Sequence, residues 1–141
     1  MTPRYHVGFS GTRKGMSDKQ KSAFQILLAG DVLHHGDCVG ADADAHQIAR
    51  RSSGISIELH PPSDDRLRAF CDFDEWNIPK PYLDRNRDIV NASTVLVACP
   101  GVMKEQHHGG TWYTIRYALS IPEYPVAIIW SNGQVEMRYG K

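Results

Sequence analysis

Apolar and polar positions along the chain follow two periods, which predict strands and helices in alternation. Six short apolar runs have the length of strands and lie at residues 5–9, 32–35, 55–59, 94–99, 125–129 and 134–138. Four stretches have the period of helices and lie at residues 18–29, 41–51, 81–93 and 109–120. The alternation predicts an α/β fold of three layers, with a mostly parallel sheet and helices on both of its faces.

Local signals support several of these boundaries. Ser17 and Gln20 have the spacing of a capping box at the start of the first predicted helix. Pro81 suits the first position of the third predicted helix, where its missing N–H costs nothing. Residues 63–80 show no clear period, so no element is predicted there beyond a possible helical turn near residues 64–68.

Length and charge restrict the classes of protein to consider. The 141 residues suit one compact domain, which we expect to span residues 1–141. Lys and Arg number 16, as do Asp and Glu, so a basic excess that would favour a nucleic acid as the main partner is absent. No apolar run approaches the ~20 residues of a membrane span, and the N-terminus does not resemble a signal peptide. Cys38, Cys71 and Cys99 are an odd number without paired spacing, so we expect a reduced, cytoplasmic protein.

Three glycine-containing loops follow predicted strands and lead into predicted helices. They lie at residues 10–13, 36–42 and 100–111. In a parallel sheet such loops gather beyond the carboxyl ends of the strands, where ligands bind. Helix N-termini attract phosphate, and glycine lets the backbone approach a ligand closely. Each loop alone is also consistent with ordinary turn chemistry, but together they predict a phosphate-binding rim.

Several side chains near this rim are candidates for ligand contact. Arg13 can pair with a phosphate, although a solvated loop arginine is the alternative. Arg85 and Arg87 lie two positions apart on a helix, so we expect one to reach the crevice and the other the surface. Asp42 either caps its helix or accepts a ribose hydroxyl, and Trp112 and Tyr113 either stack on a base or pack in the core. The predicted ligand-binding residues are Ser10, Gly11, Thr12, Arg13, Gly36, Asp37, Gly40, Asp42, Arg85, Asn86, Arg87, Pro100, Gly109, Gly110, Thr111 and Trp112.

Histidine and cysteine side chains raise the question of a zinc site. The candidates are His34, His35, Cys38, His60, His107 and His108. Structural zinc sites use two ligand pairs at short fixed spacings, whereas these histidines form adjacent doublets whose side chains diverge. Asp42 and His46 are one helical turn apart but lack an obvious second pair. We therefore expect no metal and no cofactor, and histidines that donate hydrogen bonds near a ligand.

Four motifs in order, GFSGTR, GDCVGAD, PYLDRNRDIV and HHGGTW, give the chain a resemblance to the SLOG superfamily. This superfamily contains Rossmann-like domains related to LOG-type phosphoribohydrolases and to the DNA-processing protein DprA. The resemblance covers roughly residues 5–130 and is closest to the small bacterial and phage branch. It implies a nucleotide or nucleotide-sugar pocket at the loop rim and a homodimer or higher homo-oligomer. Some members are sensors of nucleotide signals in antiviral defence.

The chain departs from a motif of the LOG-type enzymes at its glutamate and at its two leading glycines, which fall on His107 and His108. Their motif PGGxGTxxE supplies a glutamate that acts with an arginine to cleave a glycosidic bond. The resemblance places Thr114 at the glutamate position, and Arg85 or Arg87 at the arginine position. A threonine cannot take up a proton as a carboxylate does. Asp37, Asp42 or Glu105 would have to replace the missing acid.

Three functions follow from these observations. The first is a protein that binds a nucleotide, such as an ADP-ribose-like or cyclic signal, without turnover. In a phage, it would sequester a signal of host defence. The second is an N-glycosidic hydrolase of nucleoside 5′-monophosphates or related nucleotides, which uses a replacement acid. The third is an interaction module that uses the fold without a ligand.

Overall fold

The computed structural model describes residues 4–52 and 54–141, which form one seven-stranded sheet with helices on both faces. The strands are β1 (His6–Gly11), β2 (Val32–His35), β3 (Ser56–Leu59), β4 (Glu75–Trp76), β5 (Val95–Cys99), β6 (Pro125–Ile129) and β7 (Val135–Tyr139). The α-helices are α1 (Asp18–Leu27), α2 (Ala41–Arg51), α3 (Tyr82–Ala92) and α4 (Gly110–Leu119), and a short 3-10 helix, η1, spans Asp65–Leu67. None of the helices within these described residues is long and apolar enough to cross a bilayer.

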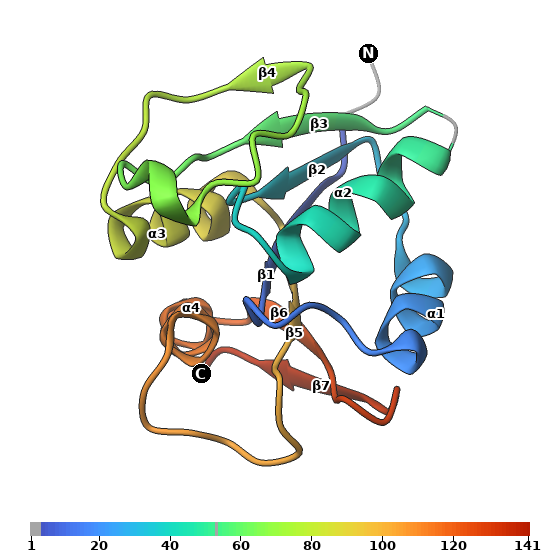
Figure 1. Ribbon diagram of the computed structural model, residues 1–141. Coiled ribbons are helices and arrows are strands. Elements are labelled where there is room, and N and C mark those ends of the chain that lie inside the picture. The colour runs from blue at the N-terminus through green and yellow to red at the C-terminus, as the bar shows by residue number, and fades with distance from the viewer. Residues whose placement is uncertain (1–3, 53) are drawn as a thin grey trace.

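The order of the strands creates a switch point in the middle of the sheet. The order is β4-β3-β2-β1-β5-β6-β7, and neighbouring strands are parallel except for β6 and β7. The chain moves outward from β1 through β2 and β3 to β4, and then returns to the other side of β1 as β5 (Figure 1). The loops after β1 and β5 therefore leave toward opposite faces, which opens a crevice between them.

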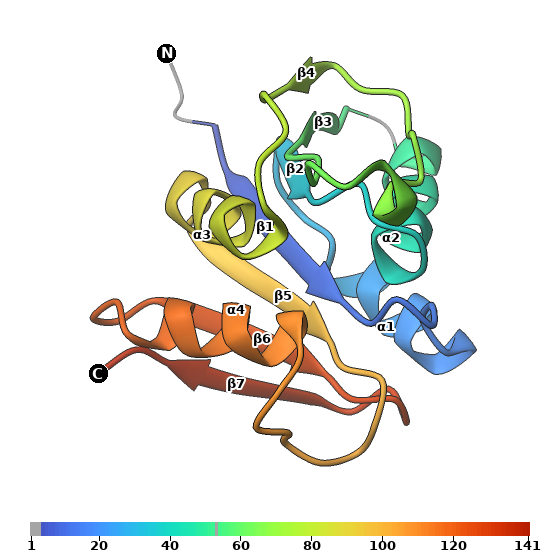
Figure 2. The same cartoon turned by 60° about the vertical axis from the view of Figure 1, so that its left-hand side comes forward.

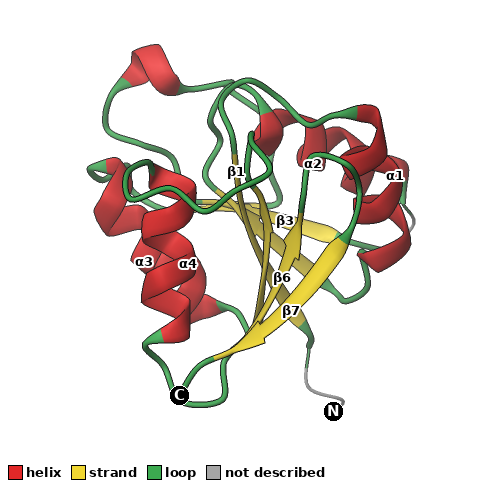
Figure 3. Cartoon of the chain, turned by 90° about the horizontal axis from the view of Figure 1, so that it is seen from below, coloured by secondary structure: helices red, strands yellow, loops and turns green. Residues whose placement is uncertain are grey.

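Each of the two helical layers buries apolar side chains against the sheet. Helices α1 and α2 cover one face, and α3 and α4 cover the other (Figure 3). Under α1 and α2, the rings of Phe9 and Phe24 meet edge to face with centroids 5.2 Å apart. Under α4, Trp112 and Ile115 pack on Leu96. Both faces are buried, which explains why the strands in the middle of the sheet read as continuous apolar runs.

The predicted α/β fold, with a mostly parallel sheet and helices on both faces, is confirmed. The capping box is also present: Gln20 N–H donates to the Ser17 hydroxyl oxygen at 3.0 Å, and Ser17 N–H donates to Gln20 Oε1 at 2.9 Å. The prediction of six strands is wrong, because residues 63–80 contain the additional strand β4. Its two residues, Glu75 and Trp76, are both exposed, so they produce no apolar pattern that sequence reasoning could detect.

Candidate functional site

A cavity of about 380 Å³ lies at the switch point, beyond the carboxyl ends of β1 and β5. Its rim is formed by residues 10–14 at the end of β1 and just after it, residues 100–102 after β5 and residues 109–112 at the start of α4. Cys38 and Asp42 contribute from the loop after β2 and the first turn of α2. The three glycine-containing loops thus meet around one volume, whose size is within the range of small-molecule pockets. Figure 2 shows the course of the long loop between β5 and α4, several residues of which line the cavity.

Several polar groups in the cavity wall have no partner within the described part of the chain. Asn86, on α3, is 6% exposed as a whole residue, and its amide is open to the cavity without a hydrogen bond to a described residue. Arg13 is exposed and forms no ion pair, and its guanidinium carbon lies 5.2 Å from the centroid of the Tyr82 ring. The backbone N–H groups of residues 110–112 begin α4 without a side-chain cap. These groups are available to a ligand.

Arg85 also lines the cavity, but the protein already uses most of its donors. Its Nε–H donates to Tyr82 O at 3.1 Å, and Nη1 donates to the carbonyl oxygens of Gly36 and of His60 (2.8 Å for the latter). Nη2 donates to Cys38 Sγ at 3.0 Å. A guanidinium has five N–H donors, so one remains on Nη2. Arg85 therefore holds the loop after β2 in place and contributes mainly its charge to the cavity.

The glycines of the GDCVGAD motif have a packing role and do not line the cavity. A Cβ at Gly36 would overlap the guanidinium of Arg85. At Gly40, φ is +94° and a Cβ would overlap the backbone of Arg13, so this glycine allows the first and second loops to touch. In addition, Ala41 N–H donates to Thr12 O at 2.9 Å across the same contact. The structure thus places two of the predicted site residues behind the wall.

Asp37, another predicted site residue, is fully buried away from the cavity. Its carboxylate accepts hydrogen bonds from Arg68 Nε and from the backbone N–H of Cys71, both at 2.8 Å. Its own N–H donates to Nδ1 of His35 at 2.9 Å, and its φ is +54°. Asp37 therefore anchors the irregular segment after η1 to the end of β2, and it is not placed to act on a ligand.

Asp42 is the carboxylate that does reach the cavity. It is 6% exposed and accepts a hydrogen bond from Cys38 N–H at 3.1 Å, whereas the α2 N-cap, Gly40, has no side-chain cap. Burial raises the pKa of Asp42 from 3.8 to about 6, even though the positive charge of Arg85 opposes this shift. Burial also raises the pKa of the Cys38 thiol, so this cysteine is not an activated nucleophile.

The remaining residues of the predicted chemistry lie elsewhere. Thr114, at the position of the family's glutamate, is 1% exposed, and its hydroxyl donates to Gly110 O at 2.7 Å on its own helix. Glu105 is on the surface and pairs with Arg138 at 2.9 Å. Arg87 points away from the cavity and donates to the Tyr113 hydroxyl at 2.6 Å. Of the three candidate replacement acids, Asp42 is the one that lines the cavity.

The cavity is also lined by residues that sequence reasoning did not select, namely Lys14, Tyr82 and Gly101. His108, one of the histidines expected near a ligand, lines it too. Tyr82 was detectable in principle, because the predicted start of α3 follows Pro81 and lies near the same edge of the sheet. Trp112 lines the cavity at 2% exposure, and its Nε1–H has no acceptor among the described residues.

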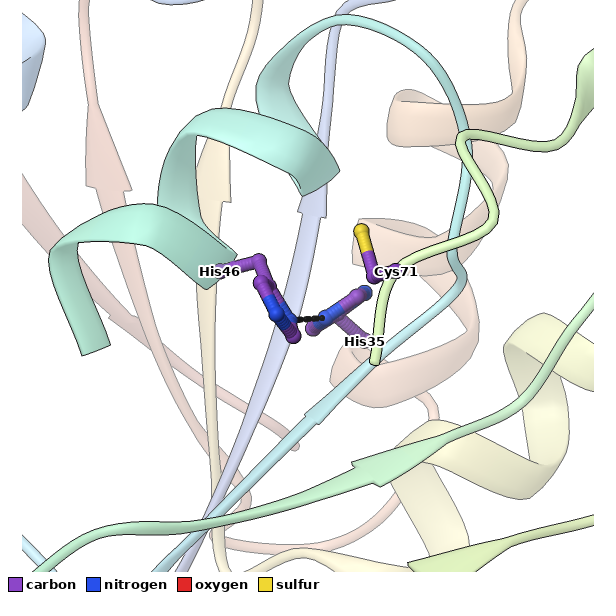
Figure 4. Close-up of side chains that lie close together, drawn as sticks. All are labelled: His35, His46 and Cys71. Carbon is purple, nitrogen blue, oxygen red and sulfur yellow. Dashed lines mark hydrogen bonds between the residues drawn. The ribbon is translucent and has the colours of Figure 1, made fainter. Parts of the chain in front are cut away.

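A hydrogen-bonded histidine pair lies beside the loop after β2 (Figure 4). His35 Nε2 is 2.9 Å from His46 Nδ1, and His46 Nε2 is 2.6 Å from Asp72 Oδ1. Because His35 Nδ1 accepts the N–H of Asp37, His35 must carry its proton on Nε2, and this proton is donated to His46. His46 then donates to the carboxylate of Asp72. Burial lowers the pKa of His35, so the chain holds it neutral.

This pair and Cys71 have ligand atoms within 4.8 Å of one another, as in a metal site. The hydrogen-bond pattern does not fit an ion, because the Nε2 that would bind it carries the proton donated to His46. A second group contains His34, Glu58 and His60, and burial lowers the pKa of His34 to about 4. His34 Nδ1 lies 2.9 Å from His60 Nε2, so these rings also bond to each other. Both groups are better explained as buried hydrogen-bond networks.

Comparisons with known proteins give likeness at the level of the fold. No protein-family profile and no curated protein sequence matches the chain. The chain is similar to the structure of the molybdenum cofactor binding protein from the phototrophic bacterium Rippkaea orientalis, with a TM-score of 0.71, 24% identity, and coverage of 96% of this chain and 89% of that one. It is also similar to the X-ray structure of TM1055, with a TM-score of 0.58, 14% identity, and coverage of 82% and 69%. These likenesses support the Rossmann-like α/β fold of the chain.

Proposed function

We propose that the protein binds a phosphate-bearing small molecule of the nucleotide or nucleotide-sugar type and does not turn it over. The observation that carries this proposal is the set of unpaired polar groups in the cavity wall. Asn86 lines the cavity with an amide that is open to it and bonds to no described residue, and the exposed Arg13 forms no ion pair there. An accessible amide without a protein partner can donate to and accept from a ligand in the cavity.

The charges around the cavity favour an anionic group. Arg13, Lys14 and Arg85 line it, and Asp42 is the one carboxylate among the described lining residues. The free N–H groups at the start of α4 add the positive end of a helix dipole. The Asn86 amide can donate and accept, which suits a sugar hydroxyl or the edge of a base. Together these features fit a phosphate joined to a sugar or a nucleoside.

Two side chains near the cavity support binding without turnover. Thr114, which the resemblance places at the position of a catalytic glutamate, is buried and bonded to its own helix. The Cys38 thiol has a raised pKa and already accepts a hydrogen bond from Arg85. Neither side chain can act as a base or nucleophile near neutral pH.

The test is a ligand panel of AMP, ADP-ribose, cyclic dinucleotides and ribose 5-phosphate. The molybdenum cofactor joins the panel because the neighbour from Rippkaea orientalis is named for binding it. Binding is followed by calorimetry and by the rise in melting temperature. The bound molecule is then recovered by denaturation and identified by mass spectrometry. Recovery unchanged supports the proposal, and a panel without any binder contradicts it.

Two variants connect binding to the cavity. Arg13→Ala should weaken a phosphate ligand about tenfold or more, because charge-assisted hydrogen bonds to phosphate are strong. Arg51→Ala is the matched control, since Arg51 is an exposed arginine at the far end of α2 and does not line the cavity. An equal loss of affinity in both variants would show that binding depends on long-range charge and not on contact between Arg13 and the ligand. The homodimer that the resemblance implies can be checked by light scattering on the same samples.

A hydrolase is the second candidate, because of Asp42. A carboxyl with a pKa of about 6 in a cavity is suited to donate or accept a proton near neutral pH. In this case a nucleotide such as AMP would release its free base during incubation. Asp42→Asn would abolish that release without abolishing binding. Product formation by the wild-type protein would replace the binding proposal with this one.

A further inference from the structure

A second hollow, which we call the tyrosine groove, adjoins the cavity on the surface of α3 and α4. It measures about 430 Å³ and is lined mainly by Tyr82, Arg87, Tyr113, Arg116 and Tyr117. Tyr82 lines both hollows, as do two residues of the loop before α4. The tyrosine groove and the cavity are therefore adjacent, with Tyr82 at the border between them.

Aromatic rings and a guanidinium form the centre of the tyrosine groove. The guanidinium carbon of Arg87 lies 5.7 Å from the ring centroid of Tyr113 and 5.5 Å from that of Tyr117. Arg87 Nε donates to the Tyr113 hydroxyl at 2.6 Å, and the Tyr117 hydroxyl donates to Asn91 Oδ1 at 2.8 Å. These bonds hold the three side chains in a fixed arrangement before any ligand arrives. Such preorganisation lowers the entropic cost of binding.

The charges of the tyrosine groove exclude a cationic occupant. Arg87 and Arg116 line it, and no described lining residue carries a carboxylate. Arg87 forms no ion pair with a described residue, whereas Arg116 lies 3.4 Å from Glu105 outside the groove. Planar rings stack on tyrosine and on guanidinium faces, and bases do so without sequence preference. The groove therefore matches a neutral planar ring or an anion, and a nucleobase is the ring that accompanies a phosphate.

We propose that the tyrosine groove binds the nucleobase of the same ligand whose phosphate end occupies the cavity. This inference rests on the proposed function and narrows its ligand to nucleotides, since a sugar phosphate without a base would leave the groove empty. Tyr82 lies at the junction, beneath Arg13, where the sugar would pass from one hollow to the other.

The experiment compares ligands with and without a base on tyrosine variants. The probes are AMP, ADP-ribose and ribose 5-phosphate, and binding is measured by calorimetry. Tyr113→Leu and Tyr117→Leu should each weaken AMP and ADP-ribose about tenfold, which is the order of one lost stacking contact. Both should leave ribose 5-phosphate within about twofold of its wild-type affinity. Tyr139→Leu is the control, since Tyr139 is an exposed tyrosine on β7, outside both hollows.

The outcomes separate this inference from the function on which it rests. If Arg13→Ala weakens all three probes but the tyrosine variants weaken none, the cavity binds phosphate and the inference about the groove is wrong. If the tyrosine variants weaken all three probes equally, the rings do not read the base and the inference is also wrong. If no probe binds the wild-type protein, both proposals fail. Tyr113→Phe, which keeps the ring, should retain most of the AMP affinity and guards against a variant that misfolds.

Discussion

Asp42→Asn tests the energetic cost of keeping a carboxylate in the cavity. Burial raises the pKa of Asp42 to about 6, so its ionised form is disfavoured in the folded protein. Each tenfold change in the ionisation constant corresponds to ~1.36 kcal/mol, so folding with this group ionised costs about 3 kcal/mol near pH 7.5. Asparagine has no charge to bury and can still accept the hydrogen bond of Cys38 N–H. The variant should therefore be more stable than the wild-type protein at neutral pH by up to ~3 kcal/mol.

The pH dependence of this difference gives the stronger test. The folded pKa is raised, so the stability that protonation of Asp42 gives is fully present below pH 3.8 and is lost as the pH rises through 6. The advantage of the variant should fall to about half of its neutral value at pH 5 and approach zero near pH 4. Urea unfolding of both proteins at pH 7.5, 6, 5 and 4 measures the difference at each pH. Groups shared by the two proteins cancel in this comparison.

Asp84→Asn is the matched control, because Asp84 is an exposed carboxylate in the first turn of α3. It should change the free energy of unfolding by less than ~1 kcal/mol, the usual worth of one charge near a helix end. A difference between Asp42→Asn and wild type that stays constant from pH 7.5 to pH 4 would refute the reasoning. It would mean that Asp42 is solvated in solution, and the hydrolase candidate would then lose its main support.

Three further predictions concern the loop after β2 and the histidines. Gly36→Ala should destabilise the protein by ~1–3 kcal/mol in urea unfolding, because its Cβ forces Arg85 out of place. Asp37→Ala should cost about 3–5 kcal/mol in the same assay, because it leaves the largely buried charge of Arg68 without a partner. His34→Gln should reduce the loss of stability on acidification between pH 6.5 and 4, by up to ~1.4 kcal/mol per pH unit. In the wild type, burial lowers the pKa of His34 to about 4, so the unfolded chain binds a proton in that range that the folded chain does not.

The fold was predictable wherever apolar periodicity reflects burial. The predicted helix at residues 41–51 and strand at residues 125–129 have the observed bounds of α2 and β6. Half of β2 consists of His34 and His35, which are poor sequence evidence for burial, yet both are buried. They tolerate burial because each finds a ring partner distant in the sequence. Such long-range pairs leave no local pattern, and neither do the two exposed residues of β4.

The candidate site was predictable in outline but not side chain by side chain. Glycines after parallel strands place three loops at one edge of the sheet, and the sequence shows this directly. Sequence reasoning could not separate Arg85 from Arg87, because the choice depends on the rotation of α3 about its axis. The structure turns Arg85 into the wall and Arg87 onto the tyrosine groove. Gly36 resembles a ligand-contacting glycine in sequence, although the guanidinium of Arg85 occupies the space beside it.

The two aspartates of the GDCVGAD motif, Asp37 and Asp42, differ in how completely the protein compensates their charges. Asp37 is buried with an arginine and a backbone N–H as partners, so its charge is fully compensated. Asp42, five residues later, is equally buried but has a raised pKa, and nearby Asn86 and Arg13 have no protein partner among the described residues. Stability alone would favour asparagine at position 42, because it avoids burying a charge. The presence of Asp42 in the cavity wall therefore supports our proposal of a ligand there, because proteins tolerate local costs in stability mainly at functional sites.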